Sequence, residues 1–346
     1  MSDWREALTQ EERDDLKKSD HPKWMSPMLA TLTDKRFSDP DWIYERKLDG
    51  ERLLLFRDGG DVRLMTRNRK QANDTYPELV EACLDQDCTD FVIDGEVVAF
   101  KDGVSSFSRL QQRMKITKQK EARSSDVAIH FYVFDLLHVD GHDLDALPLR
   151  TRKQLLRRLF QFDKPLHFTP HRNEDGEAYF EEACAKGWEG VIAKRADSPY
   201  HHSRSRDWLK FKCENGQELV IAGFTEPKGE RKGFGALLVG YYCQDKRDGG
   251  DGERLCYAGK VGTGYDDDFL VEFRDRLEAH SVDECPFADG PGGKDVTWVE
   301  PHFVGEFGFT EWTDDGKLRH PRFLGLRRDK NPRDVVRESA GETADG

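Results

Sequence analysis

One lysine stands in a context that suits a nucleophile. Lys47 lies between two apolar, strand-like runs, 42–44 and 53–56, and opens the tetrapeptide K-x-D-G that ends at Gly50. An amine attacks only in its uncharged form, which desolvation and neighbouring cations favour. The tetrapeptide alone also fits a surface hairpin turn with a lysine beside it, so the other charged motifs of the chain decide between the two.

Four further charged motifs lie within apolar runs or at their ends. They are Asp94-Gly95-Glu96 at the end of one run, Phe131 to Asp135, Glu189 to Lys194, and Trp208 to Lys212. Side chains alternate between the two faces of a strand, so Lys210 and Lys212 share one face while Phe211 points to the other. Two lysines on one face of a buried strand need anions, and a bound phosphate would supply them.

The motifs and their order resemble those of the covalent nucleotidyltransferase superfamily, which comprises ATP-dependent DNA ligases, RNA ligases and mRNA capping enzymes. From the N-terminus they are K-x-D-G, D-G-E, F-D, E-G-x-x-x-K and K-x-K. The resemblance covers residues 25–335. Glu311-Trp312, Leu318 to Pro321 and Gly325 to Lys330 are similar to DNA ligases specifically, and most of all to the ligase module of bacterial non-homologous end-joining ligases. The resemblance implies an enzyme that seals 5′-phosphate/3′-hydroxyl nicks or breaks in DNA, for repair.

The resemblance also implies a role for each motif residue in three phosphoryl-transfer steps. Lys47 would attack the α-phosphate of ATP, AMP would pass to the 5′-phosphate of the break, and the 3′-hydroxyl would displace it. The implied catalytic residues are Lys47, Asp49, Lys210, Lys212, Arg327 and Lys330. The nucleotide would contact Glu45, Arg52, Glu96, Phe134, Lys194, Lys210 and Lys212; Mg²⁺ or Mn²⁺ would bind Glu96 and Glu189; the 5′-phosphate would meet Arg67.

Several of these residues have plainer alternatives. Phe134, expected to stack on adenine, could simply fill the core, and Glu96 and Glu189 could form salt bridges. Arg67 follows a strand, where a lone arginine is usually solvated. Arg327 and Lys330 would orient pyrophosphate only if their domain closes over ATP and later swings away, which assigns a hinge to residues 213–218.

The net charge of −13, from 54 basic and 67 acidic residues, argues against a polyanionic partner, but a whole-chain sum says little about a local surface. From Arg109 to Arg123 the chain carries six Lys or Arg against one Glu. Only about 20 residues precede the core, which leaves no room for the helical DNA-binding domain of larger ligases. We therefore expect a duplex contact here, through Arg109, Arg113, Lys115, Lys118 and Lys120. An exposed helix with scattered charges is the alternative.

The apolar runs and turn signals predict an α+β fold class. A polar helix or tail over 1–21, with little to bury, precedes a mixed/antiparallel-sheet nucleotidyltransferase domain (ATP-grasp-like adenylation) over 22–215. Helices are expected over 76–84, 151–160 and 178–186. The OB-fold β-barrel spans 216–336, with strands over 219–224, 237–242, 255–261, 296–299 and 304–309 and a helix over 267–279. Residues 337–346 are expected to be disordered.

The seven cysteines include no C-x-x-C pair and are odd in number, so neither a zinc site nor a disulfide framework is expected. No run reaches the roughly 18 apolar residues of a membrane helix, and the charged start excludes a secretory signal. The cysteine pattern favours a reducing, cytoplasmic setting. We expect a monomer, nucleoid-associated in a prokaryote. Nicked or broken duplex DNA would be its substrate, and a Ku-like end-binding protein a candidate partner.

Two other functions compete. An RNA ligase or a GTP-dependent capping-type enzyme would use the same lysine motif, but the segments around Trp312 and Arg327 favour DNA ligase. A non-catalytic nucleic-acid-binding protein with an OB barrel would need stacking aromatics and a cationic groove but no nucleophile. The full set of lysines and carboxylates argues against it.

Overall fold

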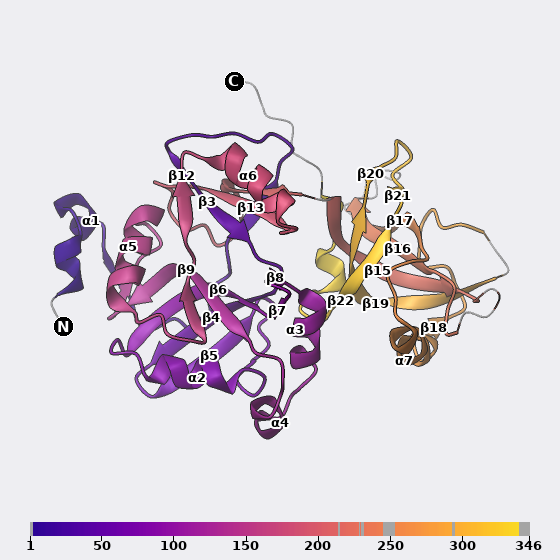
Figure 1. The fold of residues 1–346 in the computed structure, drawn as a ribbon, viewed down its shortest axis with the longest axis horizontal. Coiled ribbons are helices and arrows are strands. Elements are labelled where there is room, and N and C mark those ends of the chain that lie inside the picture. Colours follow the sequence, from indigo (N-terminus) through magenta and orange to yellow (C-terminus); the bar gives the residue numbers. More distant parts are fainter. Residues whose placement is uncertain are drawn as a thin grey trace. The chain divides into compact units, whose positions relative to one another are not determined.

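The computed structural model describes residues 3–213, 215–227, 229, 232–244, 253–292 and 295–338, and these form two compact units, Met1–Cys213 and Glu214–Ser339 (Figure 1). The expected tail of 337–346 lies, from residue 339 on, outside the described residues. Residues 215–218, expected to belong to a hinge, are instead paired with Glu306 to Phe309 in a strand of the second unit. No described helix is long and apolar enough to cross a membrane.

The larger sheet of the first unit is buried on both faces. Leu53 and Leu55 pack with helices on one side, whereas Leu54 and Phe56 face a second cluster that contains Trp208. Burial on both sides explains the unbroken apolar run at 53–56, because an alternating pattern needs one solvated face. The strand order is β1-β10-β9-β6-β4-β5, and β11 runs parallel to β9. The bounds are β1 Lys17–Lys18, β4 Glu51–Asp58, β5 Asp61–Thr66, β6 Asp90–Val98, β9 His130–Val139, β10 His142–Asp143 and β11 Leu166–Phe168.

The second sheet of this unit carries most of the charged motifs. Its order is β12-β3-β13-β14-β2, antiparallel except for β14 with β2. One face packs on α6 through Tyr44, Val191 and Phe211, which leaves the opposite face for the motif residues. The strands are β2 Leu29–Leu32, β3 Trp42–Lys47, β12 His171–Asn173, β13 Gly190–Arg195 and β14 Arg204–Lys212. The short pair β7 Phe100–Lys101 and β8 Val104–Ser105 forms a hairpin.

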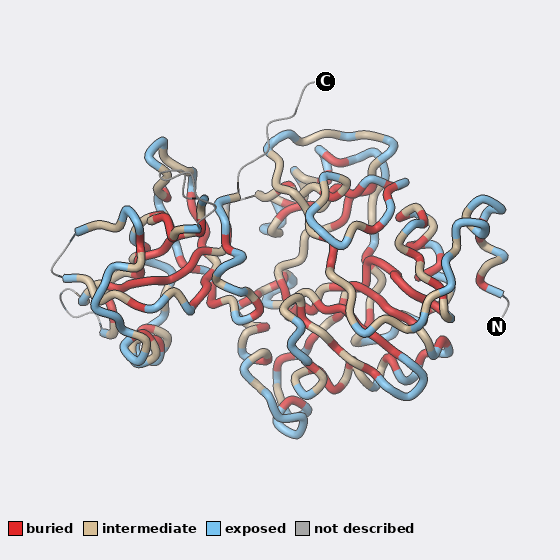
Figure 2. Tube along the Cα trace, turned by 180° about the vertical axis from the view of Figure 1, so that it is seen from behind, coloured by how far each residue is buried: buried red, intermediate tan, exposed pale blue. Residues whose placement is uncertain are grey.

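The helices of the first unit cover the sheets. They are η1 Trp4–Ala7, α1 Gln10–Asp14, α2 Pro77–Leu84, α3 Phe107–Met114, α4 Gln119–Arg123, α5 Leu149–Leu159 and α6 Gly176–Ala185. The periodicity located α2, α5 and α6 to within a few residues but not α3, which is as long as α2. Figure 2 shows buried segments in both units, with exposed segments in the outer loops. The N-terminal prediction was wrong in one respect. Trp4 and Leu8 are 4% and 3% exposed and belong to the main core. Two isolated apolar residues give too weak a pattern to reveal this burial.

The second unit is built around one six-stranded sheet of order β17-β16-β15-β19-β18, with β22 paired to β19. The runs 296–299 and 304–309, expected to be separate strands, form the single strand β19. Pro301 lies where the pairing of β15 with β19 shifts register, so its missing N–H costs no ladder hydrogen bond. The elements are β15 Asn215–Thr225, β16 Leu237–Gln244, β17 Glu253–Val261, α7 Asp267–Glu278, β18 Ser281–Val282, β19 Val296–Phe309, β20 Glu311–Trp312, β21 Leu318–Arg319, β22 Arg322–Arg327 and η2 Pro332–Asp334.

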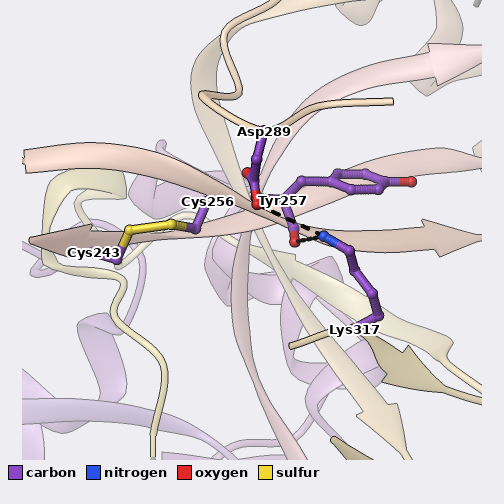
Figure 3. The surroundings of a disulfide bond; sticks show 5 residues. All are labelled: Cys243, Cys256, Tyr257, Asp289 and Lys317. Carbon is purple, nitrogen blue, oxygen red and sulfur yellow. Dashed lines mark hydrogen bonds and ion pairs between the residues drawn. A yellow bond between two sulfur atoms is a disulfide. The ribbon is translucent and has the colours of Figure 1, made fainter. Parts of the chain in front are cut away.

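The expectation of no disulfides was wrong. Cys184 is bonded to Cys213, and Cys243 to Cys256. The second bond joins adjacent strands β16 and β17, near Lys317, which donates a hydrogen bond to the Tyr257 carbonyl over 2.7 Å (Figure 3). The pairing of β16 with β17 brings Cys243 and Cys256 together, and the spacing of cysteines along the chain does not reveal this pairing.

Candidate active site

Strand β13 sets the geometry of the site because it pairs with β3 on one side and β14 on the other. Gly190 lies opposite both Lys47 and Lys212, and Ile192 lies opposite both Glu45 and Lys210. Directly paired residues point to the same face of a sheet. The register therefore gathers Glu45, Lys47, Lys210 and Lys212 on one face, while Phe211 is buried on the other.

Two motif glycines are required by close backbone contacts. Gly190 has φ of +149°, and a Cβ there would lie 1.9 Å from the carbonyl oxygen of Phe211. The position between Lys47 and Lys212 consequently carries no side chain. At Gly50 a Cβ would lie 2.1 Å from the carbonyl oxygen of Val97, so the turn after Lys47 can press against β6.

Lys47 forms an ion pair with Glu189, the residue directly before β13. The two side chains are 18% and 26% exposed, so both can be reached from solvent. The backbone on either side is fixed: the Asp49 N–H donates to Ser105 Oγ over 3.2 Å, and the Cys213 N–H donates to the Glu189 carbonyl over 3.0 Å. Lys47 is thus held at a defined, accessible point with a carboxylate beside it.

Glu45 is the centre of a buried ionic cluster. Its two carboxylate oxygens meet Lys153 of α5 at 2.5 Å and Lys194 at 2.6 Å. Burial opposes ionisation of Glu45, but the two lysines outweigh it and hold its pKa below the ordinary value. Burial also opposes the charged form of Lys194 and lowers its pKa to about 8. The sequence analysis did not identify Lys153, because a lysine in a basic amphipathic helix is normally expected on the solvated face.

Arg52 is anchored by a residue to which the sequence had assigned no role. Asp94 accepts hydrogen bonds from Arg52 at 2.5 and 2.6 Å and from the Tyr200 hydroxyl at 2.6 Å. Burial alone would lower the pKa of Arg52, but the Asp94 carboxylate raises it above its ordinary value. Asp94-Gly95-Glu96 lies inside β6 and does not end it. Glu96 is paired with Arg52 across the strands and is half-buried.

Phe134 is 7% exposed and packs edge-on against Trp208. Two cations lie over its ring, the Arg52 guanidinium at 4.4 Å and the Lys194 ammonium at 4.1 Å. The aromatic therefore fills the core in this structure, while its cationic neighbours keep it beside the residues expected to hold a nucleotide. The following Asp135 forms a fully buried pair with Arg152, at 2.7 and 2.9 Å, that fixes α5 to β9.

The expected DNA-facing residues divide into two groups. Arg113 is 2% exposed, pairs with Glu78 and donates to the Thr75 carbonyl over 2.9 Å, so its assignment to an exposed basic face was wrong. It is buried because its guanidinium contacts the Glu78 carboxylate of α2 and the carbonyls of Thr75 and Val127. Lys115, Lys118 and Lys120 are exposed, and Arg67 and Arg109 are half-buried.

Arg327 and Lys330 lie in the second unit, each beside a carboxylate. Arg327 makes a bidentate contact with Asp329 at 3.0 and 2.8 Å, and Lys330 meets Glu218 of β15 at 2.8 Å. Burial opposes the charge of Arg327, but Asp329 raises its pKa well above the ordinary value. Both cations therefore hold fixed positions on their own unit.

With this geometry in place, two family models match nearly the whole chain. Residues 27–212 match the ATP dependent DNA ligase domain, and residues 230–330 match the ATP dependent DNA ligase C terminal region. The chain belongs to the ATP-dependent DNA ligase family. Its fold is accordingly the adenylation domain followed by the OB-fold domain of these ligases, which use ATP and a divalent metal ion.

Curated ligase relatives and a solved ligase structure agree with this assignment. The chain is 37% identical over 327 residues to the multifunctional non-homologous end joining protein LigD of Pseudomonas aeruginosa, covering 93% of this chain and 37% of that protein. It is 34% identical to DNA ligase 2 of Haloquadratum walsbyi, covering 89% and 50%. A structure of mycobacterial DNA ligase D complexed with ATP and MES matches with TM-score 0.62 and 35% identity, covering 91% and 98%. The chain thus spans about two fifths to one half of these curated relatives.

Proposed function

We propose that this chain seals nicked or broken duplex DNA by using ATP, with AMP carried on Lys47. The observation that carries the proposal is the shared sheet face, on which Lys47 and Lys212 flank a glycine with no side chain and Lys210 lies in the next row. A phosphate over Gly190 would meet cations on both sides, and binding it there would place phosphorus beside the Lys47 amine. The family match supports DNA over the RNA-joining and capping alternatives.

The residues of the site suggest how each part of the reaction is served. Lys47 is ion-paired with Glu189, and its amine can attack only once it has lost a proton, which this carboxylate is placed to take. Glu96 and Glu189 are half-buried hard ligands of the kind that Mg²⁺ or Mn²⁺ prefers, and they would hold the ion. When bound, the metal neutralises phosphate charge. Lys210 and Lys212 then bind the α-phosphate, and Asp49 fixes the turn.

The nucleotide and the break would be held by the remaining motif residues. Arg52, fixed by Asp94, would contact the ribose side together with Glu96, and Glu45, with Lys194 behind it, would meet the adenine beside Phe134. Arg67 would bind the 5′-phosphate of the break. Arg327 and Lys330 would orient the leaving pyrophosphate. We further propose that the chain acts in end joining, with a Ku-like partner. It would act as a monomer in the cytoplasm, associated with the nucleoid in a prokaryote. The similarity to LigD proteins supports the role in end joining.

Covalent labelling tests the proposal directly. Incubation with α-labelled ATP and Mg²⁺ should leave AMP on the protein in an acid-labile bond, and Lys47→Ala should abolish the label. Lys47→Arg should be equally inactive, because a guanidinium stays protonated and cannot attack. Lys186→Ala, which removes an exposed lysine from the same unit, is the matched control and should label normally. Normal labelling of Lys47→Ala would refute the assignment.

A further inference from the structure

Three side chains that the ligation chemistry does not use converge beside the N-terminal segment. His21 follows β1, Asp90 opens β6, and His138 lies near the end of β9. Their ligand atoms all lie within 4.8 Å of one another, and among the described residues this is the one such group of three. Pairing explains the convergence in part, since His138 lies opposite Val92 on the neighbouring strand.

The distances within the group are close to those of a metal site. Asp90 Oδ1 lies 2.8 Å from His21 Nδ1 and 3.3 Å from His138 Nε2. Ligand bonds of about 2.0–2.2 Å in a tetrahedron place neighbouring ligand atoms about 3.3–3.6 Å apart, so His21 Nδ1 would have to move away from Asp90 Oδ1 by about 0.5 Å or slightly more. The side chains of His21, Asp90 and His138 are 10%, 27% and 1% exposed. A metal ion could therefore reach the group from the side of Asp90.

A second observation concerns the unused hydrogen-bonding capacity of the buried ring. Within the described part of the chain, Nε2 of His138 is buried, and although the Asp90 carboxylate lies 3.3 Å away, the two atoms do not form a well-aligned hydrogen bond. A buried polar atom without a well-aligned partner costs free energy, and a metal ion at this point would reduce that cost. Ring nitrogen and carboxylate oxygen are the donors that Zn²⁺ takes.

The surroundings supply the outer contacts that metal ligands usually have. The other nitrogen of His138, Nδ1, lies 3.3 Å from Ser19 Oγ, and the other oxygen of Asp90 accepts the Gly141 N–H over 2.7 Å. Such contacts orient a ligand and select the ring nitrogen that faces the metal. His21 and Ser19 both belong to the N-terminal segment, so one ion would fasten this segment to β6 and β9.

We propose that His21, Asp90 and His138 form a site for a divalent transition metal ion, best matched by Zn²⁺, with water as a fourth ligand. Two imidazoles distinguish the site from the glutamates proposed for Mg²⁺, because a hard ion prefers oxygen donors alone. The cysteine spacing had argued against a zinc site, but this site contains no cysteine. Its role is structural, since the segment that it fastens carries Trp4 and Leu8 of the core.

Calorimetric titration of the intact protein with Zn²⁺, in excess Mg²⁺ to occupy the oxygen-only sites, tests this proposal. The wild type should bind about one equivalent. His21→Gln and Asp90→Asn should each weaken the binding at least about tenfold, and Ser19→Ala, which removes an orienting contact but no ligand, by about tenfold. His302→Ala is the matched control, because it removes an exposed histidine from the second unit and should leave the binding unchanged.

Folding and function are checked separately from metal binding. Each variant should retain the wild-type circular dichroism spectrum and label Lys47 with AMP, so that a lost site cannot be mistaken for a lost fold. With Co²⁺ as the probe, the wild type should show intense tetrahedral absorption bands that His21→Gln lacks. Zn²⁺ binding that is absent in the wild type, or equal in His21→Gln and wild type, would overturn the proposal and leave the ligase assignment intact.

Discussion

At the scale of single residues, Gly190 shows why the E-G-x-x-x-K motif needs a glycine at its second position. A side chain there would collide with the Phe211 carbonyl, and it would also stand between Lys47 and Lys212 on the functional face. The glycine therefore lets β13 and β14 approach and leaves the position between the two lysines without a side chain. The sequence pattern E-G-x-x-x-K thus records a packing requirement as well as a chemical one.

Gly190→Ala should lower the free energy of unfolding by about 3 kcal/mol or more, since backbone strain and steric overlap add. Gly187→Ala is the matched control. Gly187 also has a positive φ, +67°, but a Cβ there would meet nothing within 4 Å. Its cost should be about 1–2 kcal/mol, from backbone strain alone. Urea denaturation of both variants measures the difference, and equal losses would show that the close contact at Gly190 is easily relieved.

Lys194 gives a prediction for pH dependence. Burial lowers its pKa in the folded protein to about 8, from 10.5 in the unfolded chain. Between these values the unfolded chain holds the proton and the folded protein does not, so this residue makes the free energy of unfolding rise with pH. Lys194→Met should remove up to about 3 kcal/mol of that rise. Lys186→Met, at an exposed lysine, should keep it. Urea denaturation at about pH 7.5 and about pH 10 compares them, and parallel pH profiles for the wild type and Lys194→Met would contradict the prediction.

At the scale of elements, local patterns predicted what depends on local spacing. The alternation of Lys210, Phe211 and Lys212 gave the correct faces of β14, and helical periodicity located α2, α5 and α6. Long-range pairing was beyond such patterns. Asp94 and Lys153 gain their roles from partners 42 and 108 residues away in the chain. For the same reason the strand interrupted by Pro301 was divided in two, because only its neighbour β15 shows that the pairing continues.

The segment that contains α3 and α4 is the element for which a DNA contact was predicted. With Arg113 buried, the exposed charges at Lys118 and Lys120 remain the best candidates. Each phosphate neutralised contributes about −0.9 to the slope of log affinity against log salt, so Lys118→Ala/Lys120→Ala should flatten the slope by about one to two units. AMP labelling of Lys47 should not change, because that step involves no DNA.

The matched control is Lys17→Ala/Lys18→Ala, which removes two exposed charges from β1 of the same unit. Nick binding across a salt series should give the control the wild-type slope. If both double variants flattened the slope equally, the effect would reflect net charge and not a local contact. If neither changed it, the α3–α4 segment would be an ordinary solvated surface, and the segment from His201 to Arg206 would be tested next.

At the scale of the whole molecule, the residues proposed to be catalytic are divided between two compact units. The proposed nucleophile and phosphate-binding lysines belong to the first, whereas Arg327 and Lys330 belong to the second and are held there by Asp329 and Glu218. A residue on a separate unit can serve one step and be withdrawn for another. This division predicts a variant that fails at one step of ligation only.

Lys330→Ala should abolish self-adenylylation, in which pyrophosphate must be aligned as it leaves. It should still seal a nick whose 5′-end already carries AMP, with a loss far below that of the first step, because no pyrophosphate leaves there. Lys330 suits this test better than Arg327, because removing Arg327 would also leave the buried Asp329 carboxylate without its bidentate partner and so destabilise the unit. Lys260→Ala, at an exposed lysine of the same unit, is the matched control and should perform both steps. Single-turnover assays of the two steps decide the matter: equal losses in both would show that Lys330 acts throughout the cycle and that the second unit is not withdrawn between steps.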